Sequence, residues 1–224
     1  MKLANQHIFV TGGANGIGAA IVRDVALAGA RVSFVDIDVD TSEAFSKALR
    51  AEGYDVAFAC ANVGDFVDLE KAYDSLVRQF GNVNGVVNNA GASSYADPVE
   101  MSDEQWDEIF AVDLKAIWYT AKLALPAMRA AHKGSIVNIG SMHGSPTNPK
   151  LFPIGAAKSA VMGLTRNLGV DEGQHNIRTN LLSYNSSVPP HEIAKVVTFL
   201  LSDDASFVNA SEWPVDGALS ARSA

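Results

Sequence analysis

The chain opens with a short apolar run that leads directly into a glycine-rich turn. The run at 7–10 predicts a buried strand, and apolar residues recur at helical spacing over 19–28. Between them, Gly12 permits a sharp turn, Gly16 lets the backbone approach a ligand closely, and Gly18 lets helix pack tightly on strand. The new helix directs its unpaired N–H groups and positive dipole end toward this turn. The sequence therefore predicts a phosphate-binding turn, although a glycine-rich turn without a ligand gives the same pattern.

A carboxylate follows the second apolar run. This run, 31–35, ends in Asp36, eighteen residues after Gly18. In a βαβ dinucleotide-binding fold, a carboxylate near this place accepts hydrogen bonds from the ribose hydroxyls of adenosine. Neither Asn15 nor Ile37 is a cation that would meet a 2′-phosphate. These residues favour NAD(H) over NADP(H).

The length, net charge and cysteine content of the chain indicate which kinds of protein and partner to expect. Its 224 residues suit a single α/β domain, 1–224, and its net charge of -8 argues against a nucleic-acid partner. Cys60 is the only cysteine, so no internal disulfide is expected, and we interpret it as a small buried residue at the end of a strand. Because no secretion signal or membrane-spanning run is visible, we expect a cytoplasmic protein without a membrane partner.

Strand and helix patterns alternate along the whole chain. Further strands are predicted at 55–60, 85–88, 134–139, 177–182 and 212–215, and further helices at 41–51, 67–80, 102–131, 155–169 and 190–201. We expect a kink at Pro126, and Pro214 indicates an edge strand or a strand end. Strict alternation with short links predicts an α/β fold: a mostly parallel, doubly wound, Rossmann-like sheet covered on both faces.

Several spaced motifs together resemble the short-chain dehydrogenase/reductase family over nearly the whole chain. The matching segments are 11–18 (TGGANGIG), 88–91 (NNAG), 134–141 (GSIVNIGS), 155–158 (GAAK) and 215–217 (VDG). The resemblance implies a single Rossmann-like domain with a seven-stranded sheet. It also implies a homodimer or homotetramer formed through two long helices, here around 112–130 and 155–169. In this family a hydride passes between a nicotinamide cofactor and a small-molecule alcohol or carbonyl compound.

The family's catalytic positions are only partly retained. Ser141 stands where a serine binds the substrate oxygen, and Lys158 stands where a lysine holds the ribose and lowers the pKa of a tyrosine. The tyrosine position, thirteen residues after Ser141 and four before Lys158, is occupied by Ile154. The position of the family's asparagine is occupied by Asp113.

These departures predict weak catalysis. Isoleucine has no proton to exchange, and general acid–base help is commonly worth about 10²- to 10⁴-fold in rate. If Asp113 lies near Lys158, the carboxylate keeps the ammonium charged, which favours a static ion pair over a proton relay. The alternative for Asp113 is a solvated residue on a helix.

The segment after the sixth strand is short, and two other residues near the catalytic positions could donate a proton. The chain passes from the sixth strand through 183–190 directly into a helix, without the family's segment that closes over the substrate. His143, two residues after Ser141, is a candidate proton donor, and Tyr184 is a second. The other histidines are interpreted as surface residues without metal-ligand spacing: His7, His132, His175 and His191.

The remaining cofactor-binding positions lie in the turns that follow strands. They are Ile17, Asn62, Val63, Asn88, Ala90 and Gly91, with Lys158 at the ribose. For Asn88 an alternative stays open, since this side chain is also suited to linking neighbouring strands.

Two functions are consistent with this pattern. The first is an NAD-dependent oxidoreductase acting slowly on a secondary alcohol, polyol or carbonyl compound. The second is a non-catalytic NAD(H)-binding protein, a pseudoenzyme that serves as a regulatory or assembly subunit. Binding of NADH tests both, and single-turnover oxidation of bound NADH distinguishes them.

Overall fold

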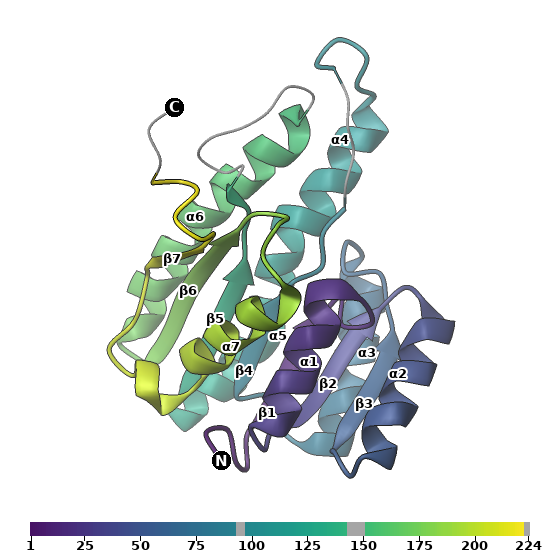
Figure 1. Ribbon diagram of the computed structural model, residues 1–224, viewed down its shortest axis with the longest axis vertical. Coiled ribbons are helices and arrows are strands. Elements are labelled where there is room, and N and C mark those ends of the chain that lie inside the picture. Colours follow the sequence, from purple (N-terminus) through teal and green to yellow (C-terminus); the bar gives the residue numbers. More distant parts are fainter. Residues whose placement is uncertain (93–96, 143–150, 222–224) are drawn as a thin grey trace.

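The computed structural model describes residues 1–92, 97–142 and 151–221, and its centre is one seven-stranded sheet (Figure 1). The strand order is β3-β2-β1-β4-β5-β6-β7, and every pairing is parallel. The strands are β1 (His7–Thr11), β2 (Arg31–Asp36), β3 (Val56–Cys60), β4 (Gly85–Asn88), β5 (Gly134–Ile139), β6 (Ile177–Tyr184) and β7 (Glu212–Val215). The predicted doubly wound, Rossmann-like α/β fold is confirmed.

Helices cover both faces of the sheet because its strands are apolar on both sides. They are α1 (Gly16–Leu27), α2 (Val39–Ala51), α3 (Phe66–Phe80), α4 (Asp103–Phe110), α5 (Ala116–Ala131), α6 (Phe152–Gly173) and α7 (Pro190–Leu201). Buried side chains of α1, α2 and α7 share one core cluster, whereas those of α3 and α5 share the cluster on the opposite face. Each face of the sheet is therefore sealed from water.

The sheet reverses its strand order between β1 and β4. From this point β2 and β3 extend in one direction, and β5, β6 and β7 extend in the other. Ligands of open α/β sheets bind outside the carboxyl ends of the strands at such a switch point. The glycine-rich turn after β1 lies there.

The predicted helix over 102–131 is interrupted. A π-helical turn, Ala111–Lys115, separates α4 from α5, and α5 continues past Pro126. π-turns of this kind are frequent at functional sites. The helix predicted over 155–169 is longer, Phe152–Gly173, because Pro153 fits the first helical turn.

Two predictions of burial are wrong. His7 is fully buried, because β1 is a central strand and the imidazole contacts the Gly81 carbonyl at 2.8 Å and the Ser33 hydroxyl at 2.6 Å. Cys60 is exposed, because β3 is an edge strand. Pro214 does lie in an edge strand, β7, as predicted. In the described part of the chain, no helix is long and apolar enough to span a membrane.

Candidate cofactor-binding and catalytic site

The turn after β1 is held by close backbone packing. Gly12 has a φ of +65°, and a Cβ atom on it would lie 2.9 Å from the Ala90 Cα. A Cβ on Gly18 would lie 1.9 Å from the Gly12 carbonyl oxygen, so no other residue fits there. The Asn89 side chain donates to the same oxygen at 2.8 Å. The close approach of α1 to the end of β1 at Gly18 is as predicted, and the turn also packs against the segment that follows β4.

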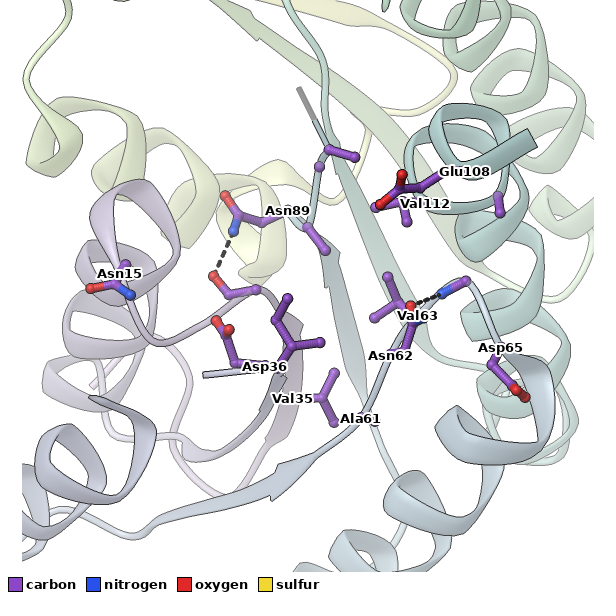
Figure 2. A pocket seen from close by; sticks show the side chains of 17 residues that line it. Asn15, Val35, Asp36, Ala61, Asn62, Val63, Asp65, Asn89, Glu108 and Val112 are labelled. Atoms are coloured by element: carbon purple, nitrogen blue, oxygen red, sulfur yellow. Dashed lines mark hydrogen bonds between the residues drawn. The ribbon is translucent and has the colours of Figure 1, made fainter. Parts of the chain in front are cut away.

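A cavity of about 710 Å³ lies beside this turn, at the carboxyl ends of β1, β2, β3 and β4 (Figure 2). Eight predicted cofactor-binding residues line it: Gly12, Asn15, Asp36, Ile37, Asn62, Val63, Ala90 and Gly91. Gly16, Ile17, Gly18 and Asn88 lie outside this lining. Among the described residues, its wall contains carboxylates but neither lysine nor arginine.

Asp36 is oriented by the backbone around it. Its Oδ2 accepts a hydrogen bond from the Ala14 N–H at 3.0 Å, and its Oδ1 accepts one from the Asp38 N–H at 3.2 Å. A carboxylate oxygen accepts more than one hydrogen bond, so both oxygens keep acceptor capacity for a ligand. A carboxylate fixed in this way, next to a glycine turn and a helix N-terminus, has the donors and acceptors that an adenosine diphosphate needs.

The side chain of Asn88 links strands, which is the second of its two predicted roles. Its Nδ2 donates to Asn138 Oδ1 at 2.8 Å, and its Oδ1 accepts from the Thr120 hydroxyl at 2.7 Å. Both functional atoms are buried and paired, so this amide is not available to a cofactor. The structure thus bears out the alternative in which the Asn88 side chain links neighbouring elements, whereas proximity of this residue to a cofactor stays a prediction.

A buried ion pair lies at the other end of the site. Lys158 Nζ is 2.7 Å from Asp113 Oδ1, and the side chains are 12% and 1% exposed. Asp113 Oδ2 also accepts a hydrogen bond from the Ala92 N–H at 3.0 Å. The π-turn presents Asp113 inward, so the alternative of a solvated helix residue is wrong. The predicted proximity of Asp113 to Lys158 is confirmed.

Gly91 connects this pair to the cavity. A Cβ on Gly91 would lie 3.1 Å from Asp113 Oδ1 and 3.7 Å from Lys158 Nζ. Asp113 Oδ1 is buried and, in the described residues, accepts no hydrogen bond beyond its ion-pair contact. Gly91 therefore forms the wall between the cavity and the enclosed ion pair, and a side chain at this position would crowd Asp113.

Ile154 is packed among hydrocarbon side chains. It is 9% exposed and belongs to a cluster with Ile109, Leu151 and Ala157, one turn of α6 before Lys158. Ser141 follows the end of β5 and is partly exposed. His143, the predicted alternative proton donor, lies outside the described residues.

Tyr184, the other candidate donor, ends β6 and is half-buried. Burial raises the pKa of its phenol, and the negative charge of Asp113 raises it further. The phenol therefore keeps its proton at neutral pH and lies within electrostatic reach of the ion pair.

Sequence reasoning missed the wall of the cavity opposite Asp36. Glu108 and Val112 project from α4 and the π-turn toward the cavity, as Figure 2 shows. Their spacing of four residues places them on one face of a helix, but only the three-dimensional placement of α4 shows that this face meets the cavity. In the described residues, no group of histidine, cysteine or carboxylate side chains is arranged to hold a metal ion.

The chain was compared with protein families and with individual proteins. The short chain dehydrogenase family profile matches residues 6–185. A 2-(S)-hydroxypropyl-CoM dehydrogenase from Xanthobacter autotrophicus is 32% identical over 251 aligned residues, covering 98% of each chain. This alignment is longer than the present chain, so that relative contains residues without a counterpart here.

Solved structures have the same fold. The structure of gox2181 superposes with a TM-score of 0.95 at 29% identity, covering 99% of this chain and 98% of that one. A gluconate 5-dehydrogenase from Burkholderia cenocepacia, in complex with NADP and tartrate, gives 0.93 at 24% identity, with the same two coverages. The family match spans most of the chain, and the protein therefore belongs to the short chain dehydrogenase family.

Proposed function

We propose that this protein binds NAD(H) and catalyses slow hydride transfer between the nucleotide and a small alcohol or carbonyl compound. The family is one of oxidoreductases that use a nicotinamide cofactor. The observation that supports the slow rate is the buried, apolar surrounding of Ile154, one helical turn from the Lys158–Asp113 pair.

The adenosine half of the site favours NAD(H). Asp36 faces the cavity with fixed oxygens that suit two ribose hydroxyls, and a 2′-phosphate in their place would meet a negative charge. The fold itself does not select the cofactor, because a protein of the same fold holds NADP. Selectivity must therefore come from this chain's own residues, and Asp36 is the one that we assign to it.

The other half retains binding groups but lacks the tyrosine of the family. Bound NADH would supply a hydride to the substrate carbonyl carbon. Ser141 would hydrogen-bond the substrate oxygen, and Lys158 would hold the ribose while its charge stays balanced by Asp113. Ile154 gives no proton to the developing alkoxide, which removes help commonly worth about 10²- to 10⁴-fold.

A second function is favoured by the same ion pair. A lysine paired with a buried carboxylate is suited to structural use, so the chain also fits a non-catalytic NAD(H)-binding subunit. Oxidation of bound NADH by a carbonyl compound separates the two proposals.

The first experiment compares nucleotides by thermal unfolding. NADH at about 100 times its Kd is expected to add roughly 2.7 kcal/mol of stability, with a smaller shift for NADPH. Asp36→Asn should reduce the NADH shift and narrow the difference between the two nucleotides. Lys47→Met, an exposed position in α2 outside the cavity lining, is the control. Equal shifts with NADH and NADPH in the parent protein would refute the cofactor assignment.

The second experiment follows single-turnover oxidation of bound NADH by cyclohexanone, acetoin and benzaldehyde. Slow but measurable oxidation supports the oxidoreductase. Binding of NADH without any oxidation supports the non-catalytic subunit.

We also propose that residues 1–224 form one domain that assembles into a homodimer or homotetramer. Half of the Trp118 side chain is exposed beside a groove of about 590 Å³ between the π-turn and α6. Phe110, Leu114 and Leu164 line the same groove. Light scattering should show a multimer that Trp118→Glu weakens.

A further inference from the structure

Tyr184 ends β6, and Ser141 follows the neighbouring strand β5, so both belong to the carboxyl edge of the sheet. The parallel ladder pairs Ile139 of β5 with Leu182 of β6, and the Gly140 N–H donates to the Leu182 carbonyl at 2.7 Å. Ser141 and Tyr184 each follow that pair by two residues, and neighbouring strands lie about 4.8 Å apart. The register therefore places the backbones of Ser141 and Tyr184 side by side at the carboxyl edge of the sheet. The Tyr184 ring packs against the core cluster that contains Ile139 and Leu182.

The surroundings of the phenol connect it with the catalytic end. Tyr184 is half-buried, and its pKa responds to the charge of Asp113, which is the partner of Lys158. By contrast, the side chain at the tyrosine position of the family, Ile154, has no hydroxyl and packs in a cluster with Ile109, Leu151 and Ala157. Tyr184 thus offers a hydroxyl near the ion pair where Ile154 offers none.

The turn that follows Tyr184 fixes its backbone. Asn185 Nδ2 donates to the Asp216 carbonyl at 3.0 Å, and Asn185 Oδ1 accepts from the Ser187 N–H at 2.9 Å. Pro189 and Pro190 then begin α7 directly. This hydrogen-bonded turn holds the end of β6 in one position, which is what a proton donor requires.

We infer that the Tyr184 hydroxyl is the proton donor for carbonyl reduction in this protein, in the role that Ile154 cannot fill. The inference rests on the proposed oxidoreductase function. NADH, when bound, would supply a hydride to the carbonyl carbon and leave as NAD⁺, and the carbonyl π electrons would move to oxygen. That oxygen takes the proton from Tyr184 as the phenol O–H bond breaks, and water reprotonates the phenolate. Alcohol oxidation runs through the same steps in reverse.

The test removes the hydroxyl but keeps the ring. Tyr184→Phe should lower the single-turnover rate of NADH oxidation by cyclohexanone about 10-fold or more, with NADH affinity unchanged. Tyr54→Phe is the matched control, because Tyr54 precedes β3 at the opposite edge of the sheet and should leave the rate unchanged. Tyr184→Phe at the parental rate would overturn the inference, even if Tyr184→Ala were slow, because that pattern shows a packing role for the ring.

The same substitution is then made in the Ile154→Tyr variant, which tests whether the Tyr184 hydroxyl acts as a proton donor. In Ile154→Tyr, the restored phenol supplies the proton, so adding Tyr184→Phe should have little further effect on the rate. An equal loss in both backgrounds would contradict the proton-donor role. If the parent protein bound NADH but oxidised none of it, both the inference and the oxidoreductase proposal would fail, whereas the NADH-binding proposal would stand.

Discussion

The two ends of the candidate site differ in how they use their polar groups. At the cavity beside β1 and β2, the Asp36 oxygens are oriented by backbone N–H groups and retain acceptor capacity. At the other end, the charged groups of Lys158 and Asp113 neutralise each other, and Ile154 lies in hydrocarbon. The Asp36 end thus keeps hydrogen-bond acceptors for a ligand, whereas the charged groups at the Lys158 end are largely paired with each other.

Under the proposed function, nucleotide binding and proton transfer depend on separate features of the fold. Binding requires close backbone packing around Gly12 and one oriented carboxylate, which tolerate few changes. Proton transfer requires one hydroxyl, and its loss leaves the packing of α6 intact because isoleucine fills the space with apolar contacts. The proposal therefore separates the rate of the reaction from the stability of the fold.

The largest expected effect comes from restoring the phenol at the apolar end. Ile154→Tyr should raise the rate of NADH-dependent cyclohexanone reduction about 10- to 10³-fold, because a phenol one helical turn from Lys158 supplies the part of general acid catalysis that Tyr184 does not. Single-turnover absorbance of NADH measures it. Ile154→Phe adds a similar ring to the Ile109–Leu151 cluster without the hydroxyl and should give no increase. An increase of equal size with Phe would assign the effect to packing.

The next prediction concerns the ion pair. Lys158→Met leaves Asp113, 1% exposed, without its cation, and should lower the free energy of unfolding by about 3–5 kcal/mol. Urea unfolding at neutral pH measures the loss. Lys2→Met breaks a pair with Asp204 that has the same 2.7 Å separation but is more than half exposed. This control should cost less than about 1 kcal/mol. Equal losses would mean that burial does not set the value of the Lys158–Asp113 pair.

Much of this arrangement is predictable from the sequence because its signals are local. Strand and helix periodicity gives the order of elements, and the distance from Gly18 to Asp36 gives the ribose carboxylate of the predicted site. The pairing of Asp113 with Lys158 follows from the family resemblance, and the structure places the two in contact.

The remaining features depend on contacts between distant elements. The burial of His7 follows from the central place of β1 in the sheet, and the exposure of Cys60 follows from the edge position of β3. The π-turn at Ala111–Lys115 and the approach of Glu108 to the cavity depend on how α4 docks. No local pattern in the sequence specifies these contacts.

His7 lies at the start of β1, away from both ends of the candidate site. Its titration should give a pH-dependent loss of stability that neither end of the site causes. Burial lowers the pKa of His7 to about 4 from 6.5, aided by the charge of Arg31 and opposed by the hydrogen bond to Gly81. Between pH 6.5 and 4, His7 is therefore protonated in the unfolded chain but neutral in the folded chain. Stability from this group is complete above pH 6.5 and falls as the pH is lowered toward 4, by about 3 kcal/mol.

The measurement is the free energy of unfolding across that pH range, for the parent protein and for His7→Gln. Carboxylates titrate in both proteins, so the difference between the two curves isolates His7. The variant should be less stable at pH 7 and should lose less on acidification. Parallel curves would show that His7 is not the group responsible.

The smallest effect on stability tests the nucleotide-binding end. Gly16 and Gly53 both have positive φ, +53° and +93°, and a Cβ on either would meet no atom within 4 Å. Changing either one to alanine should cost about 1–2 kcal/mol, from the left-handed backbone conformation alone. Only Gly16 lies in the turn where we propose the pyrophosphate to bind, so Gly16→Ala should also weaken NADH binding in a titration. Gly53→Ala, which follows α2, should leave binding unchanged. If both variants bound NADH as the parent protein does, the pyrophosphate would not lie against this turn, and the assignment of the nucleotide-binding end would have to be abandoned.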